Sequence, residues 1–358
     1  MIAIEAAFWL SLLLVAYVYA GYPLLLAVWS RWRPRPVERG GAEPTVSLVM
    51  AVRNERERLE RKLENCLALD YPPEKLQIVV SLDGSCDGTA GVAARYAARG
   101  VEVVRSERHR GKAAALNSGV AAARGEIVLF CDARQRLDPG AVRELVACFT
   151  DPSVGAASGE LVLLDDSGGV AAGGVGLYWR YEKVVRAMES RVHSAVGATG
   201  ALYAIRRELW APLPEDTLLD DVLVPMRIVL AGRRTVFEPA ARAYDREAPP
   251  ELEFARKVRT LAGNFQLLGL LPGLLSPRSN PVFVQFVSHK LGRLAVPHLL
   301  IVLLVSNLFL LEGVYLVFLA GQCAWYLLAS AGAIAARGGE RPAAEAPARI
   351  LQRRQRPT

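Results

Sequence analysis

IVVSLDGSCDGT, residues 78–89, is the stretch that decides the fold. It begins as a run of apolar and β-branched residues, which is typical of a buried strand. The run ends at Asp83 and a Gly84-Ser85 turn, and a second carboxylate follows at Asp87. Ligands of open α/β sheets bind beyond the carboxyl ends of the strands, and small residues let backbone amides approach a polar group. The stretch therefore predicts a ligand site next to Asp83.

The same pattern continues on both sides of this stretch, from residue 44 to about residue 245. Strand-like runs occur at residues 46–52, 101–104 and 127–130, and helix-like segments occur at residues 55–69, 88–98 and 112–124. Strands that alternate with helices favour right-handed crossovers and a parallel sheet covered on both faces. We therefore predict an α/β domain of residues 44–263 with a Rossmann-like, mostly parallel sheet.

Acidic or amide side chains follow three of the predicted strands. They are Asn54 and Glu55 after the first strand, Asp83 after the second, and Asp132 after the fourth. One reading makes them helix caps and turn formers. The alternative is a polar site along one sheet edge, in which Asp132 binds Mg²⁺ or Mn²⁺, since these ions prefer oxygen ligands.

Two further features fit a phosphorylated ligand at that edge. Lys112 follows a His-Arg-Gly sequence and is placed to bind a diphosphate. Asp220 and Asp221 precede a helix-like run of residues 222–230. They are either ordinary capping residues or the source of a general base that takes a proton from an acceptor hydroxyl.

The remaining apolar sequence lies near the two ends of the 358-residue chain. Residues 2–29 predict one transmembrane helix, and residues 294–336 predict two, divided near Glu312. Residues 264–291 are interrupted by Pro and Gly and are predicted to lie in the headgroup layer of the lipid bilayer. Residues 337–358 are predicted to form a basic cytoplasmic tail.

Basic residues beside the apolar stretches predict the orientation. Arg31, Arg33 and Arg35 follow the first stretch, and His289, Lys290 and Arg293 precede the second. The positive-inside rule then predicts an integral protein of the cell inner membrane with a cytoplasmic domain and an outside N-terminus. These basic residues contribute to the net charge of +7, and anionic lipid at the cytoplasmic face of the membrane attracts them. Nucleic acid is not an expected partner, because basic and aromatic residues do not interleave.

Five segments in order resemble the motifs of family 2 inverting glycosyltransferases: VSLVMAVRNE, IVVSLDGSCDGT, GKAAALNSGVAAARGEIVLFCDA, GATGALYAIRREL and LLDDVLVPMRIVLAG. With the apolar helices, they are similar to the membrane-bound branch that includes cellulose, hyaluronan and poly-N-acetylglucosamine synthases. The resemblance implies a GT-A fold and a hexosyltransferase that uses a nucleotide-sugar, most commonly a UDP-sugar. It implies that Asp83 contacts the nucleoside, that Asp132 holds the metal, and that Asp221 is the catalytic base.

The sequence departs from the family pattern at two places. Arg134 stands where the metal motif usually has a second aspartate, and RKVRT, residues 256–260, replaces the Gln-x-x-Arg-Trp of processive synthases. Arg259 matches the arginine and is a candidate clamp on the diphosphate; a lipid-facing role is the alternative. The acceptor is either a growing polysaccharide or a single membrane lipid. A catalytically silent scaffold that binds nucleotide or a partner subunit is the alternative from another functional class.

Overall fold

The computed structural model describes residues 1–165, 169–170, 174–246 and 250–338. The basic tail predicted at residues 337–358 lies, apart from its first two residues, outside the described residues. The chain divides into two compact units. One unit comprises residues 15–296, and the other comprises residues 1–14 together with the residues from 297 onward.

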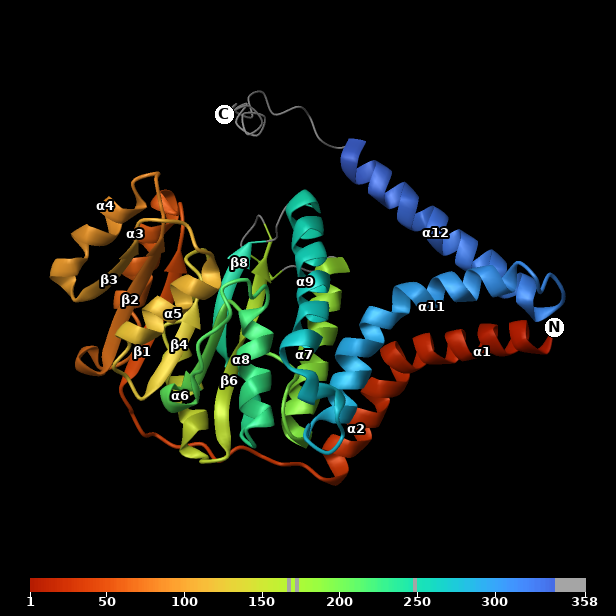
Figure 1. Cartoon of the computed structure of the whole chain (residues 1–358), viewed down its shortest axis with the longest axis horizontal. Helices are drawn as coiled ribbons and strands as arrows, with labels where there is room; N and C mark the ends of the chain where they lie inside the picture. The colour runs from red at the N-terminus through yellow and green to blue at the C-terminus, as the bar shows by residue number, and fades with distance from the viewer. Residues whose placement is uncertain (166–168, 171–173, 247–249, 339–358) are drawn as a thin grey trace, which may run out of the picture. The chain divides into compact units, whose positions relative to one another are not determined.

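A mixed, mostly parallel sheet of eight strands forms the centre of the larger unit, in the order β3-β2-β1-β4-β7-β6-β8-β5 (Figure 1). The strands are β1 (Val46–Val52), β2 (Leu76–Asp83), β3 (Val101–Ser106), β4 (Ile127–Cys131), β5 (Arg136–Leu137), β6 (Val154–Leu164), β7 (Leu202–Arg206) and β8 (Arg234–Arg246). Strands β3, β2, β1 and β4 run parallel, whereas β7 pairs antiparallel with both β4 and β6. This arrangement confirms the predicted fold class.

Helices cover both faces of the sheet. They include α3 (Arg56–Leu67), α4 (Thr89–Arg95), α5 (Lys112–Ala122), α6 (Ala141–Ala147), α7 (Gly174–Val192), α8 (Asp220–Leu230) and α9 (Pro250–Leu270). Short 3₁₀ turns occur at Pro73–Lys75, Ala97–Arg99, Cys148–Thr150, Arg207–Leu209 and Pro272–Leu275.

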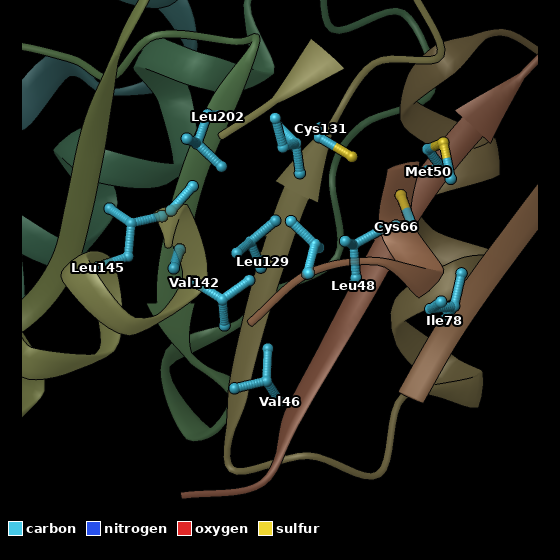
Figure 2. Packing of buried hydrophobic residues seen from close by; sticks show 14 of the residues in the cluster. Val46, Leu48, Met50, Cys66, Ile78, Leu129, Cys131, Val142, Leu145 and Leu202 are labelled. Carbon is cyan, nitrogen blue, oxygen red and sulfur yellow. The ribbon is translucent and has the colours of Figure 1, made fainter. Parts of the chain in front are cut away.

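Alternation of side chains along β1 divides the interior into two cores. Val46, Leu48 and Met50 point into one core with α3, α4 and α6, and Val49 points into the other core with α5 and α8. Figure 2 shows the first core, in which the side chains of Val142 and Leu145 of α6 lie near Leu129 of β4. Burial on both faces is why these strands read as continuous apolar runs rather than as an alternating pattern.

The register of the parallel strands places their carboxyl ends at one edge. Val52 of β1 pairs with Leu82 of β2, and Val49 of β1 pairs with Phe130 of β4. The residues that follow β1, β2 and β4 are therefore neighbours along this edge, as predicted from the sequence.

If Asp220 or Asp221 capped helix α8, the helix would begin after that residue. In the structure the helix already includes both of them. Asp220 and Asp221 are its first two residues, and Leu219 occupies the N-cap position without a side-chain hydrogen bond. Both carboxylates therefore belong to the first turn, where the partial positive charge of the helix N-terminus favours them.

Three helices in the described part of the chain are long and apolar enough to cross a membrane: Ile2–Trp32, Phe283–Asn307 and Val314–Gly332. The first contains α1 (Ile2–Ala16), a π-helical segment η1 (Tyr17–Gly21) and α2 (Tyr22–Trp32). The second contains α10 (Phe283–Gln285), a π-helical segment η7 (Phe286–Leu291) and α11 (Gly292–Asn307). The third lies within α12 (Val314–Gly338).

The second of these helices begins earlier than the predicted residue 294. Residues 283–291, assigned from the sequence to an interfacial segment, continue directly into α11, and residues 264–270 form the end of α9. Pro272 and Pro281 fall between these helices, where a missing backbone N–H is tolerated. In the smaller unit, the ring of Phe8 packs edge-on against Tyr315 with a centroid separation of 5.0 Å.

Candidate active site

The loops after β1 and β2 are joined to each other by hydrogen bonds. The backbone N–H of Asn54 donates to Ser85 Oγ at 3.1 Å, and Asn54 Oδ1 accepts from the backbone N–H of Cys86 at 3.0 Å. The N–H of Glu55 donates to Thr89 Oγ1 at 2.9 Å. Asn54 has a φ of 53°, a left-handed conformation that asparagine tolerates better than most residues. The hydrogen bonds of Asn54, Glu55 and Ser85 therefore fix the loops after β1 and β2 relative to each other at this edge of the sheet.

Asp83 is buried at the end of β2, with only 4% of its surface exposed. Its carboxylate lies 2.6 Å from His109 Nδ1 and accepts the backbone N–H groups of Arg110 and Gly111 at 2.7 and 3.0 Å. These bonds hold the loop that leads into Lys112, the first residue of α5. In this structure Asp83 thus positions the lysine-bearing loop.

Gly84 is required by the close approach of that same loop. Its φ is +60°, and a Cβ at this position would lie 2.5 Å from the backbone nitrogen of His109. The sequence suggested that Gly84 makes room for a ligand. The neighbour that the structure places there is the chain's own backbone.

Lys112 is the centre of the site. Its Nζ lies 3.2 Å from Asp132 Oδ1 and 3.2 Å from Asp220 Oδ1. Burial opposes the ammonium charge, but Asp132, Asp220 and Asp221 together raise the pKa of Lys112 above its usual value. Lys112 is therefore cationic throughout the physiological pH range and joins the end of β4 to the first turn of α8.

Asp221 differs from Asp220 in its surroundings. Asp220 is buried and accepts a hydrogen bond from the Tyr203 hydroxyl at 3.3 Å in addition to its ion pair. Burial raises the pKa of Asp221, the charge of Asp220 raises it further, and the charges of Lys112, Lys290 and Arg186 oppose the rise. A carboxyl with a raised pKa is a better proton acceptor, which suits a general base.

The structure around Asp221 leaves no room for a side chain at residue 200. A Cβ on Gly200 would lie 2.9 Å from Asp221 Oδ2, and the backbone carbonyl of Asp221 accepts the N–H of Ala198 at 2.7 Å. The Gly-Ala-Thr-Gly segment of residues 197–200 is therefore packed against the start of α8.

The described residues contain no group of three or more His, Cys, Asp or Glu side chains that could hold a metal ion. Asp132 and Asp220 nevertheless converge on one cation, the Lys112 ammonium, from two different elements. Side-chain exposure of 38% leaves Asp132 accessible to a second cation. Mg²⁺ and Mn²⁺ are commonly held by one or two carboxylates together with substrate phosphates, so Asp132 fits such an ion.

Arg134 occupies the position where a second metal-binding aspartate was expected from the family pattern. Its guanidinium forms an ion pair with Asp245 of β8 at 2.7 Å, and Gln135 Nε2 donates to the same carboxylate at 2.9 Å. The Asp245 side chain is 7% exposed. The chain has therefore replaced a carboxylate by a fixed cation three residues after the end of β4.

The structure does not bring Arg259 to the other candidates. Arg259 is exposed on α9, and within the described residues no ion pair links it to Asp132, Asp220 or Asp221. Sequence reasoning instead missed Arg186 of α7 and Lys290 of η7, whose charges act on Asp221. A charged residue inside an apolar helix is a signal of function, and Lys290 carried that signal.

Residues 47–209 match the family model described as Glycosyl transferase family 2. This domain belongs to glycosyl transferase family 2. The match includes the loops after β1, β2 and β4 and the segment 197–200, whereas α8 with Asp220 and Asp221 lies beyond it.

Curated relatives of the glycosyltransferase include poly-beta-1,6-N-acetyl-D-glucosamine synthases. The protein of Staphylococcus aureus (strain COL) is 26% identical over 204 residues, which cover 56% of this chain and 49% of the relative. That of Staphylococcus epidermidis is 34% identical over 116 residues, which cover 32% of this chain and 28% of the relative. The chain thus spans about half the length, or less, of the curated relatives it matches.

A solved structure resembles a larger part of the glycosyltransferase. It is a mannosyltransferase from Pyrobaculum calidifontis in complex with GDP-Man and Mn²⁺, with a TM-score of 0.73 and 26% identity. The similarity covers 90% of this chain and 92% of the other. The likeness therefore extends beyond the catalytic domain to the flanking helices.

Proposed function

We propose that this protein is an inverting glycosyltransferase that moves a sugar from a nucleotide-sugar to a hydroxyl group at the membrane surface. The observation that carries the proposal is the meeting of Lys112, Asp132 and Asp220 at one point, with Asp221 beside them. An ammonium, an accessible carboxylate and a half-buried carboxylate of raised pKa supply the charges that a sugar diphosphate and its acceptor need.

The donor diphosphate would bind against Lys112. The ammonium offsets the negative charge that develops on the departing nucleoside diphosphate, as a preorganised cation does in other transfer reactions. The hydrogen bonds between the Asp83 carboxylate and residues 109–111 hold Lys112 in place for this task. A direct contact of Asp83 with the nucleoside, as the family resemblance implies, is part of the proposal.

Asp132 would hold a divalent ion, for which Mn²⁺ is the first candidate because the mannosyltransferase of known structure contains it. Such an ion polarises the phosphoryl oxygens of the leaving group. Arg134 adds a fixed positive charge nearby in place of a second carboxylate. One protein carboxylate with substrate oxygens and water is a common ligand set for these ions.

Asp221 would act on the acceptor. Its carboxylate takes the proton from the acceptor hydroxyl while the acceptor oxygen forms a bond to the anomeric carbon. The bond from that carbon to the diphosphate oxygen breaks, and the electron pair leaves with the nucleoside diphosphate. A single displacement on the face opposite the leaving group inverts the anomeric centre.

The test is release of nucleoside diphosphate by the purified protein in lipid, with UDP- and GDP-sugars offered separately and with Mn²⁺ or Mg²⁺. UDP is the carrier that the family resemblance favours, and GDP-Man is the ligand of the mannosyltransferase. Metal-dependent turnover of one donor by the wild type, lost in Asp221→Asn, is the expected result. Asp216→Asn, a change at an exposed aspartate on the preceding loop, is the matched control.

Two outcomes would overturn the proposal. Donor binding without turnover, over lipid, glycan and water as acceptors, would favour the catalytically silent scaffold, for which the Arg134–Asp245 ion pair is the supporting observation. Absence of binding to any nucleotide-sugar would reject the donor class itself.

A further inference from the structure

Two cationic side chains near the base lack carboxylate partners. Arg186 of α7 is half-buried and donates from Nη1 to the hydroxyl of Thr199 at 2.7 Å. Lys290 of η7 is half-buried as well. Within the ranges that the structure describes, neither side chain forms an ion pair. Partly buried positive charges without a partner are costly, which makes this pair unusual.

The two nearest glutamates of α7 already have other partners. Glu189 accepts from the Tyr22 hydroxyl at 2.6 Å and lies 2.8 Å from Nδ1 of His289. Glu182 lies 3.2 Å from Nε2 of the same imidazole and also forms an ion pair with Arg293. An imidazole that meets a carboxylate at each nitrogen donates from both when it is doubly protonated.

Glu182 and Glu189 are therefore engaged by His289 and Arg293, and among the described residues neither forms an ion pair with Arg186 or Lys290. The network is buried and connects α2, α7 and η7 within one unit of the chain. Its rigidity holds η7, and with it Lys290, against α7.

The unpaired cations lie on the side of the catalytic base. Thr199, the partner of Arg186, precedes Gly200, whose Cα faces the carboxylate of Asp221 so closely that a Cβ would lie 2.9 Å from Oδ2. The charges of Lys290 and Arg186 both act on Asp221. Lys290 also belongs to Phe283–Asn307, a helix long and apolar enough to cross a membrane.

Lys290 sits in a π-helical segment, Phe286–Leu291, and Ser288 of this segment lies 2.8 Å from the hydroxyl of Tyr17 in the π-helical segment Tyr17–Gly21. Isolated π-helical turns within α-helices are frequent at functional sites, because they redirect side chains. Two such turns in contact with each other indicate that this region is shaped for a task other than packing.

We propose that Arg186 and Lys290 bind the phosphodiester of an anionic membrane lipid whose free headgroup hydroxyl faces Asp221 as the acceptor. This inference rests on the proposed function and names its acceptor class. Arginine binds phosphate through paired N–H donors, and lysine binds it as a point charge. The position of Lys290 on an apolar helix favours a lipid over a soluble anion.

The reaction requires that the acceptor hydroxyl be a different group from the negatively charged phosphodiester. A phosphate oxygen that is already anionic would need no base, whereas an alcohol must lose its proton to Asp221 as its oxygen bonds to the anomeric carbon. The phosphodiester stays intact, and the nucleoside diphosphate leaves with the electron pair. The acceptor class is therefore a glycerophospholipid with a phosphodiester and a free alcohol in its headgroup.

The experiment uses the full-length protein in phosphatidylcholine vesicles with the donor that it turns over. Phosphatidylglycerol supplies the phosphodiester and the alcohol, diacylglycerol supplies an alcohol without charge, and phosphatidic acid supplies charge without a headgroup alcohol. We expect sugar transfer to phosphatidylglycerol, little transfer to diacylglycerol, and competition by phosphatidic acid. Free phosphate at the same concentration is expected not to compete, since it lacks the lipid anchor.

Variants test the two side chains. Lys290→Met and Arg186→Gln are each expected to lower kcat/KM for phosphatidylglycerol about tenfold to a hundredfold, the range for losing a hydrogen bond to a charged group. The affinity for the donor should not change, and Lys290→Arg should restore most of the transfer. Arg278→Gln, at an exposed basic residue beside the same helix, controls for general attraction to anionic vesicles.

The failure of this inference is distinct from failure of the proposed function. Equal transfer to diacylglycerol and phosphatidylglycerol, or transfer to a soluble glycan that Lys290→Met leaves unchanged, would reject the anionic lipid while the donor chemistry stands. Competition by free phosphate as strong as that by phosphatidic acid would reject the lipid source. Absence of donor turnover under every condition would instead reject the proposed function.

Discussion

Two groups of cations act on Asp221: Lys112, here called the donor side, and Arg186 with Lys290, here called the helical side. The two sides differ in how their charge is balanced. Lys112 meets two carboxylates at 3.2 Å, so its charge is compensated before any substrate binds. Arg186 and Lys290 have no such ion pair among the residues described. On the proposed function, a donor diphosphate would share Lys112 with the carboxylates of the donor side. On the helical side Glu182 and Glu189 are engaged by His289 and Arg293, which is why we assign an anionic ligand to Arg186 and Lys290.

The comparison also shows how each side is built. The donor side is assembled from loops at the carboxyl ends of parallel strands, where hydrogen bonds to Asp83 fix the approach to Lys112. The other side is assembled from two helices, held together by the buried pairs of His289 with Glu182 and Glu189. The sheet edge is common to many α/β proteins, whereas the helical side depends on α7 and on the apolar helix Phe283–Asn307.

The strongest test removes the group between the two sides. Asp221→Asn should lower kcat by about 10³-fold, because proton transfer by a positioned base contributes on that order. Donor affinity should change little, since Lys112 and Asp132 remain. Single-turnover kinetics and equilibrium binding of the donor separate the two quantities. An unchanged kcat would show that Asp221 is a structural residue of α8.

The second test breaks the donor side alone. Lys112→Met removes the cation between Asp132 and Asp220 and should lower kcat/KM for the donor about 100-fold, as loss of one preorganised electrostatic group does. Lys112→Arg should recover part of the activity. If both variants lost activity for every acceptor to the same degree, the effect would lie on the donor side, as expected. An acceptor-specific loss would contradict the assignment.

The third test uses pH. Because burial and Asp220 raise the pKa of Asp221, the transfer rate should fall with decreasing pH at values above the usual aspartate range. Asp220→Asn removes a negative neighbour and should move this acid limb to lower pH, whereas Lys290→Met removes a positive neighbour and should move it to higher pH. The measurement is kcat against pH for the wild type and both variants. If the acid limbs of the three pH profiles coincided, a group other than Asp221 would be responsible for the fall in rate.

The smallest expected effect concerns the stability of the helical side. Tyr22→Phe removes one hydrogen bond to Glu189 and should lower the free energy of unfolding by about 1–2 kcal/mol. Thermal unfolding in detergent, with the hydroxyl deletion Tyr19→Phe at an exposed tyrosine as the control, measures the difference. Equal midpoints for the two variants would mean that the Tyr22 hydrogen bond contributes no net stability.

Local patterns were sufficient for the fold and for the meeting of Lys112 with Asp132 and Asp220. Continuous apolar runs between helix-like segments predicted the parallel strands, and the residues directly after those runs had to meet at one edge. Asp132 and Lys112 were chosen for this reason, and the structure places them 3.2 Å apart. The family motifs led to Asp220 and Asp221 in the same way, since each motif is a continuous segment.

The helical side could not be predicted from local pattern. His289 and Lys290 were interpreted as charges that flank a membrane helix, but His289 is buried against Glu189, which lies 100 residues away in the sequence. Arg259 on α9 is exposed in the structure, and its role as a clamp on the diphosphate stays a prediction. Neither residue type nor spacing reveals which face of one helix will pack against another.

The sequence by itself therefore determined the α/β class, the sheet edge and the carboxylates that follow its strands, because strand length, burial and side-chain alternation are local properties. Tertiary structure alone decided that Asp83 holds the loop before Lys112, that Arg134 forms an ion pair with Asp245, and that the charges of Arg186 and Lys290 act on Asp221. The physical reason is that a charge acts through space. Its partners depend on which distant segments the fold brings within a few ångströms of it.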